Sequence, residues 1–113
     1  MITLESIIEF FDNCMENNLS IRSYGSGDLC ISEKLTRKDE QVPDHWYYRT
    51  LDIYYSINDE NELEISIDHS DEYCTFIKTK DAKDKALWTL CLDRIHKYIK
   101  SRAEQKFNSF IWK

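Results

Sequence analysis

The stretch LDIYYSINDENELEISIDH, residues 51–69, decides the fold, because it holds two strand patterns separated by a turn. Residues 45–57 are rich in Tyr, Trp and Ile, which are residue types that favour β-strands. In residues 62–69 apolar and polar side chains alternate, as they do in a strand with one buried face. The apolar face of this second strand consists of Leu63, Ile65 and Ile67.

The register of the hairpin follows from matching apolar side chains across the two strands. It leaves residues 59–61 as a three-residue loop, which is a common hairpin length. The predicted apolar pairs are Ile57 with Leu63, Tyr55 with Ile65, and Ile53 with Ile67. On the other face the same register sets Asp52 opposite Asp68, Tyr54 opposite Ser66, and Ser56 opposite Glu64. Two facing carboxylates destabilise a sheet by up to about 1 kcal/mol, so a positively charged partner would favour this arrangement.

Helical patterns lie at both ends of the chain. Residues 3–18 have apolar side chains at 3–4 spacing, and a longer pattern of this kind runs from residue 82 to about residue 106. In this second helix the predicted inward side chains are Leu87, Trp88, Cys91, Ile95, Tyr98 and Ile99. Because the tail after residue 106 is aromatic, we expect it to pack on the sheet or on a partner.

Between the first helix and the hairpin, Gly25-Ser26-Gly27 predicts a turn between short strands at residues 19–24 and 28–35. Residues 36–44 are polar and predict a loop, and residues 73–79 predict a further strand. The expected fold is therefore α+β, with an antiparallel sheet of about four to five strands and both helices on one face. Residues 1–113 are expected to form a single domain.

Composition narrows the class of protein. The 113 residues are 42% hydrophobic and include 2 Gly and 1 Pro, which excludes collagen-like and low-complexity chains. No apolar run reaches the roughly 18 residues of a membrane-spanning helix, and the first residues lack a signal-peptide pattern, so we expect a cytoplasmic protein without membrane contact. The four cysteines form no C-x-x-C pair, which favours free thiols over a metal site.

Charge is distributed unevenly along the chain. Residues 50–77 contain eight acidic residues and no Lys or Arg, whereas residues 78–113 contain ten basic and four acidic residues. The net charges of residues 1–49, 50–77 and 78–113 are therefore −4, −8 and +6. An acidic segment of this kind repels nucleic acid and attracts basic surfaces, although such a face also serves to keep a protein soluble.

The outward face of the central hairpin is the candidate binding surface. Side chains two residues apart on a strand are about 6.6–6.8 Å apart, so acidic residues in this row can imitate a phosphate backbone. Aromatic side chains that remain at a surface are typical interface anchors, unless a helix or the loop at residues 36–44 covers them. The predicted partner-binding residues are Trp46, Tyr48, Asp52, Tyr54, Asp59, Glu60, Glu62, Glu64 and Asp68.

Other chemistry has less support in the sequence. His69 and Cys74 are candidates for a thiol–imidazole pair of a small hydrolase, but we expect them on different sides of a turn. The basic side chains of the last helix could contact nucleic acid, yet the sequence pI of about 5.0 opposes this. We therefore predict no catalytic residues, no metal, no cofactor and no direct binding of nucleic acid.

In size, acidity, free thiols and an antiparallel sheet beside helices, the chain resembles small phage inhibitors such as anti-CRISPR proteins, and toxin-immunity proteins. The predicted function is a non-enzymatic inhibitor, monomeric or homodimeric, that occupies the basic groove of a nucleic-acid-binding enzyme and replaces phosphates with carboxylates. The alternative is an acidic dimeric secretion or assembly chaperone that holds a partner segment on its sheet or first helix. For that chaperone we expect the aromatic tail, residues 107–112, at the dimer interface.

Overall fold

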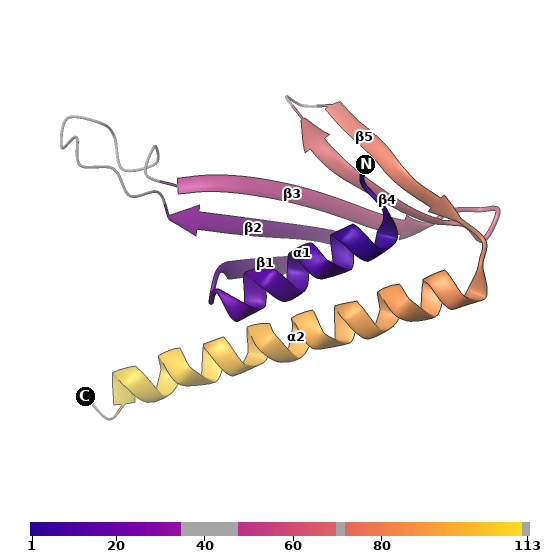
Figure 1. The fold of residues 1–113 in the computed structure, drawn as a ribbon. Coiled ribbons are helices and arrows are strands. Elements are labelled where there is room, and N and C mark those ends of the chain that lie inside the picture. Colours follow the sequence, from indigo (N-terminus) through magenta and orange to yellow (C-terminus); the bar gives the residue numbers. More distant parts are fainter. Residues whose placement is uncertain (35–47, 70–71, 112–113) are drawn as a thin grey trace, which may run out of the picture.

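The structure is a computed structural model that describes residues 1–34, 48–69 and 72–111. Its five strands form one antiparallel sheet in the order β1-β2-β3-β4-β5, so every strand lies beside its neighbour in sequence. Both helices lie side by side on one face of this sheet, which confirms the predicted α+β class (Figure 1). The elements are α1 (Leu4–Glu16), β1 (Ser20–Tyr24), β2 (Asp28–Lys34), β3 (Tyr48–Ile57), β4 (Leu63–His69), β5 (Glu72–Thr79) and α2 (Ala82–Ile111).

The central hairpin has the predicted register. Ile57 pairs with Leu63 and Ile53 pairs with Ile67, as matching of apolar side chains requires. The loop is held by Asn58, whose Oδ1 accepts hydrogen bonds from the backbone N–H groups of Glu60 and Glu62 at 3.0 and 2.9 Å. Asn61 closes the loop with φ of 62°, a left-handed conformation that Asn tolerates well.

The first hairpin depends on Gly27, which has φ of 88°. A Cβ atom at this position would lie 2.3 Å from the carbonyl oxygen of Tyr55 on the neighbouring strand. The backbone approaches so closely because the carbonyl of Gly27 accepts a hydrogen bond of 2.9 Å from the Tyr55 N–H. Only glycine fits both the left-handed conformation and this contact.

The core lies between the sheet and the two helices. Phe11 of α1 and Trp88 of α2 meet at its centre with ring centroids 6.1 Å apart, and Tyr55 of β3 lies 5.4 Å from Trp88. Burial of apolar side chains is the main source of stability for a domain of this size. The buried core residues are Leu4, Ile7, Phe11, Cys14, Ile21, Leu29, Ile31, Ile53, Leu63, Ile65, Ile77, Trp88, Cys91 and Ile95.

Two polar contacts fix α2 against the end of α1. The Tyr98 hydroxyl donates a 2.5 Å hydrogen bond to the carbonyl of Leu19. Arg102 donates to the backbone carbonyl of Asn18 at 2.7 Å, in the turn where Asn18 takes φ of 58°. These contacts satisfy carbonyl groups in the turn that follows α1.

The last helix differs from the prediction in two ways. It continues to Ile111 rather than ending near residue 106, because residues 107–110 contain no proline or glycine to stop it. The prediction that Leu87 points inward is wrong, since its side chain is 37% exposed. Leu87 precedes Trp88 by one residue, a rotation of roughly 100° that turns it out of the core stripe. Neither α1 nor α2, as far as the described ranges extend, is long and apolar enough to cross a membrane.

Candidate protein-binding face

The side of the sheet opposite the helices, here called the open face, carries polar and aromatic side chains. Strand alternation places it there: Ile21, Leu29, Ile53 and Ile65 point to the helices, so their neighbours in sequence point away. One row of the register crosses all five strands on this face. It consists of Tyr24, Asp28, Tyr54, Ser66 and Thr75.

Three carboxylates gather on the open face, Asp28 of β2, Asp52 of β3 and Asp68 of β4. The pairing of β3 with β4 ends at Ile53 and Ile67, one residue short of the predicted Asp52–Asp68 pair. Among the described residues, no cationic group lies within ion-pair distance of these three side chains. The sheet thus brings three carboxylates together that form no ion pair with residues 1–34, 48–69 or 72–111.

Two of these carboxylates lack hydrogen-bond donors. Within the described part of the chain, Oδ1 of Asp28 and Oδ1 of Asp68 are shielded from solvent and accept no hydrogen bond. An acceptor in this state costs about 1–3 kcal/mol, more when it is charged. A donor from outside the chain would remove that cost only after the side chain turned its shielded oxygen toward solvent.

The pKa of the Cys30 thiol is raised in part by these carboxylates. Cys30 pairs with Asp52 across β2 and β3, and Asp28 is two residues before it on the same face. Burial raises the pKa of Cys30 first, and hydrogen bonding to Asp52 and the charges of both aspartates raise it further. A raised pKa favours the neutral thiol, the opposite of the lowered pKa that activates a nucleophilic cysteine.

Two tyrosines stand beside the carboxylates. Tyr54 and Tyr73 pack edge to face with ring centroids 4.4 Å apart, and the Tyr73 side chain is 56% exposed. The pKa of Tyr54 is raised well above its usual range, mainly by hydrogen bonding to the Tyr73 side chain. Desolvation and the charges of Asp28 and Asp52 raise it further. Aromatic pairs of this geometry are favourable by about 0.5–1.5 kcal/mol beyond the area they bury, so the two rings form an ordered surface.

The acidic row at the start of β4 has a cationic neighbour of its own. Lys78 of β5 places its Nζ 3.7 Å from Glu64 Oε1 and 4.0 Å from Glu62 Oε1. The Asn58 side-chain amide donates to Glu62 Oε1 at 3.2 Å and to Glu64 Oε1 at 3.0 Å. The bond to Glu62 is the main reason that the pKa of Glu62 is lowered. Lys78 thus offsets part of the charge in the predicted phosphate-like row.

The predicted residues therefore fall into several groups. The structure brings Asp52, Tyr54 and Asp68 together on the open face, while Asp59 and Glu60 lie exposed in the β3–β4 loop. Trp46 and the loop predicted at residues 36–44 lie outside the described residues, and only the backbone of Tyr48 is described. Asp28 and Tyr73 were not among the predicted partner-binding residues, although the alternation of residues 28–32, with Leu29 and Ile31 inward, predicts an outward side chain for Asp28.

The arrangement offers little for catalysis. The register puts His69 and Cys74 on the two strands of the β4–β5 hairpin, on the helix-covered side of the sheet, and both side chains are exposed. Exposed groups lack the desolvation that tunes a catalytic pKa. No group of three His, Cys, Asp or Glu side chains within the described ranges is placed to hold a metal ion.

The fold defines a class of protein, an α+β meander with two helices on one face and an acidic, aromatic open face. The chain matches no known family model, and no curated protein or solved structure shows significant similarity to it.

Proposed function

We propose that the protein is a non-enzymatic inhibitor that docks its open face onto the basic groove of a nucleic-acid-binding enzyme. In this proposal Asp28, Asp52 and Asp68 take the place of phosphates, and Tyr54 and Tyr73 anchor the contact. Arginine and lysine side chains of the partner donate to carboxylate oxygens in the way they donate to phosphate oxygens.

One observation carries the proposal: the shielded Oδ1 atoms of Asp28 and Asp68, which accept no hydrogen bond from the described residues. Rotation of each carboxylate brings its Oδ1 to the surface, where a partner that supplies two donors forms the hydrogen bonds and removes the cost of the unmet acceptors. The exposed ring of Tyr73 beside them gives the partner an apolar contact, and binding anchors of this type lie at the centre of interfaces.

The test uses the intact protein as bait at low salt and identifies the captured proteins by mass spectrometry. The proposal expects a basic nucleic-acid-binding protein that loses its DNA or RNA when the bait binds. The variant Asp28→Asn/Asp68→Asn removes two charges without changing side-chain shape, and we expect it to slow association by about tenfold or more. A captured enzyme that binds both bait and nucleic acid at once contradicts the proposal.

A matched control distinguishes the effect of the open-face carboxylates from the effect of the protein's net charge. Asp93→Asn/Glu104→Gln removes the same two charges from exposed positions on α2, on the other side of the molecule. At an ionic strength of about 0.1–0.15 M it should leave the association rate within about twofold of the original, because exposed charges beyond the Debye length of about 8–10 Å are then screened. Equal slowing by both variants would mean that net charge, rather than the open face, drives binding.

A second candidate function is favoured by a different observation. Phe107 and Phe110 near the end of α2 are 63% and 77% exposed. Exposed aromatic side chains at the end of a long helix suit the dimeric chaperone that the sequence suggested as the alternative. Retained capture of a partner by the Asp28→Asn/Asp68→Asn variant, together with its loss on Phe107→Ala/Phe110→Ala, would favour the chaperone over the inhibitor.

A further inference from the structure

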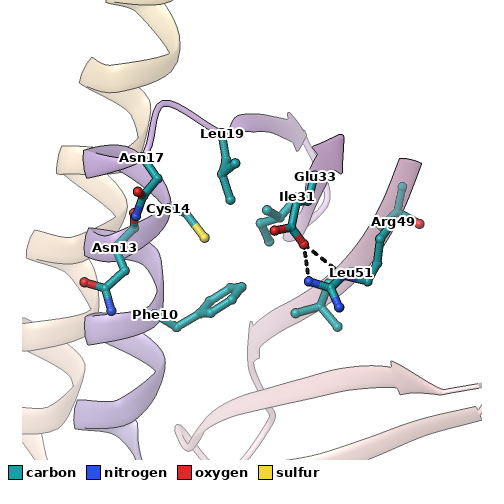
Figure 2. Close-up of a pocket in the computed structure, with 10 residues that line it drawn as sticks. Phe10, Asn13, Cys14, Asn17, Leu19, Ile31, Glu33, Arg49 and Leu51 are labelled. Carbon is teal, nitrogen blue, oxygen red and sulfur yellow. Dashed lines mark hydrogen bonds and ion pairs between the residues drawn. The ribbon is translucent and has the colours of Figure 1, made fainter. Parts of the chain in front are cut away.

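The helix-covered side of the sheet contains an apolar groove along α1. A cavity of about 380 Å³ lies beside the C-terminal half of α1, where Phe10 and Cys14 face Ile31 and Leu51 of the sheet (Figure 2). A second cavity of about 230 Å³ lies beside the N-terminal half and is almost entirely apolar. Phe10 and Leu51 line both cavities, so the two cavities adjoin at these side chains and together form the α1 groove.

The groove exists because α2 packs on the other side of α1. Arg94 of α2 contacts Asp12 of α1 at 3.3 Å, which fixes the pair of helices toward the β1 side of the sheet (Figure 1). The inward side chains of the sheet are therefore less buried the farther they lie from the two helices. Ile53 is 1% exposed, but its neighbour across the register, Ile67, is only half-buried.

The α1 side chains that line the groove are apolar or neutral, but the next row on the helix surface is acidic, since Glu9 lies four residues before the lining residue Asn13 and Glu16 three residues after it. The sequence of α1 contains no Lys or Arg, and Glu5, Glu9 and Glu16 are all exposed along it. Arg49 on the opposite bank forms an ion pair with Glu33, so it adds no free positive charge. A helix that enters this groove should therefore have apolar side chains on one stripe and basic side chains beside them.

The end of α2 has this composition. Residues 103–110 are all exposed, and Ala103, Phe107 and Phe110 follow one another at spacings of four and three residues, so they form one apolar stripe. Lys100 and Lys106 lie beside this stripe and are exposed, as is Glu104. With three basic residues and one acidic residue, residues 100–110 have a net charge of +2. At about 1.5 Å per residue, the 30-residue α2 is roughly 45 Å long and the 13-residue α1 only roughly 20 Å, so α2 runs past the end of α1 (Figure 1).

We propose that residues 100–110 of one copy dock in the α1 groove of a second copy. Phe107 and Phe110 enter the two cavities, and Lys100 and Lys106 lie against the glutamates of α1. Figure 1 shows the C-terminal ends of α1 and α2 at the same end of the molecule, so both copies can exchange their helix ends across one two-fold axis. Reciprocal docking closes a dimer, whereas one-way docking would build open chains.

The area is sufficient for a stable dimer. Phe107 and Phe110 are 63% and 77% exposed, so at about 150–250 Å² for a whole aromatic side chain the four phenylalanines of a reciprocal dimer remove roughly 400–700 Å² from solvent. The groove walls that they cover contribute a comparable area, and the neighbouring lysine stems add to it, which brings the total to the roughly 1,200 Å² of a specific interface. The dimer leaves the open face free, so this inference goes beyond the proposed inhibitor function and stands independently of it.

The test is the oligomeric state of the full chain, measured by sedimentation velocity over a wide concentration range. We expect a single species of twice the 13.6 kDa monomer mass, and a monomer for Phe107→Ala/Phe110→Ala with an unchanged circular dichroism spectrum. Leu90→Ala is the matched control, because Leu90 is 58% exposed but lies on another side of α2. A monomeric wild-type chain, a series of growing polymers, or equal loss of the dimer in the control overturns the proposal.

A charge exchange tests the orientation of the docked helix. Glu9→Lys and Lys106→Glu should each raise the dissociation constant by about threefold to tenfold, and the double variant should recover most of the loss. If the double variant is weaker than both single variants, the helix end does not lie along α1, and the proposed docking is wrong.

Discussion

At the scale of single residues, Gly27 is the position where backbone geometry is least tolerant. We predict that Gly27→Ala destabilises the fold by about 3 kcal/mol. A left-handed conformation costs a non-glycine residue about 1–2 kcal/mol, and the added Cβ would overlap the Tyr55 carbonyl oxygen at 2.3 Å. Urea denaturation measures the difference. Gly25→Ala is the control, because no atom lies within 4 Å of its Cβ position, and it should change stability by less than about 0.5 kcal/mol.

The labelling rate of the Cys30 thiol measures the effect of the open-face carboxylates on its pKa. Asp52 raises the pKa of the Cys30 thiol by hydrogen bonding and by its charge, so Asp52→Asn should lower that pKa toward its ordinary value. A lower pKa means more thiolate at pH 8.5, and we therefore expect iodoacetamide to label Cys30 several-fold faster in this variant. The measurement uses a Cys74→Ser background, because Cys74 is exposed whereas Cys14 and Cys91 are buried.

The control for this labelling is Asp59→Asn, which removes an exposed carboxylate from the β3–β4 loop. Asp59 does not contribute to the raised pKa of Cys30, so the labelling rate should stay the same. Equal rates in all three proteins would mean that Asp52 has a negligible effect on the thiol, and that burial together with the charge of Asp28 raises its pKa.

At the scale of elements, α1 begins with a capping box. The Thr3 hydroxyl accepts from the Ser6 N–H at 3.1 Å, and the Ser6 hydroxyl accepts from the Thr3 N–H at 2.8 Å. We predict that Thr3→Ala lowers the free energy of unfolding by about 1 kcal/mol, whereas Thr3→Ser has little effect because its hydroxyl can still accept. Thermal and urea denaturation should agree on this order. A loss as large in Thr3→Ser as in Thr3→Ala would assign the effect to the threonine methyl group instead.

The elements also show what sequence patterns can and cannot predict. The β3–β4 register was predictable because matching of apolar side chains leaves few alignments, and the one that pairs Ile57 with Leu63 also gives a loop of common hairpin length. The extent of α2 was not, because helix ends depend on capping and on tertiary contacts, and residues 107–110 lack a stop signal. The exposure of Leu87 likewise depends on where the second helix lies, which its own periodicity does not determine.

The candidate site was predictable only in part, for a related reason. Hairpin register placed Asp52, Tyr54 and Asp68 on one face, because that relation is local in the chain. Asp28 and Tyr73 reach the same face through strands β2 and β5, and sequence alternation alone does not say which strands become neighbours. The contact of Lys78 with Glu64 was not predicted for the same reason. Lys78 directly follows residues 50–77, which contain no Lys or Arg, and the pairing of β5 with β4 places it opposite Glu64.

At the scale of the whole molecule, the chain separates its charges onto different surfaces. The acidic middle segment supplies β3, β4 and much of β5, whereas the basic last segment forms α2 on the opposite side of the sheet. Two surfaces are therefore available at once: the open face for a basic partner and the α1 groove for the end of α2 from a second copy. Because the sheet lies between them, variants of one surface should leave the other unaffected.

The last prediction concerns how the open face attracts a basic partner. Asp68 has no cationic neighbour among the described residues, whereas Lys78 already lies 3.7 Å from Glu64. Asp68→Asn should therefore slow association with the captured partner more than Glu64→Gln does, although each removes one charge. Glu64→Gln also frees Lys78, but that side chain is 58% exposed and well screened, so the difference between the variants should shrink as salt rises above roughly 0.15 M. Stopped-flow association rates at several salt concentrations measure this. Equal rates for the two variants at low salt would show that the partner responds to the total charge of the sheet and not to the carboxylates left unpaired on it.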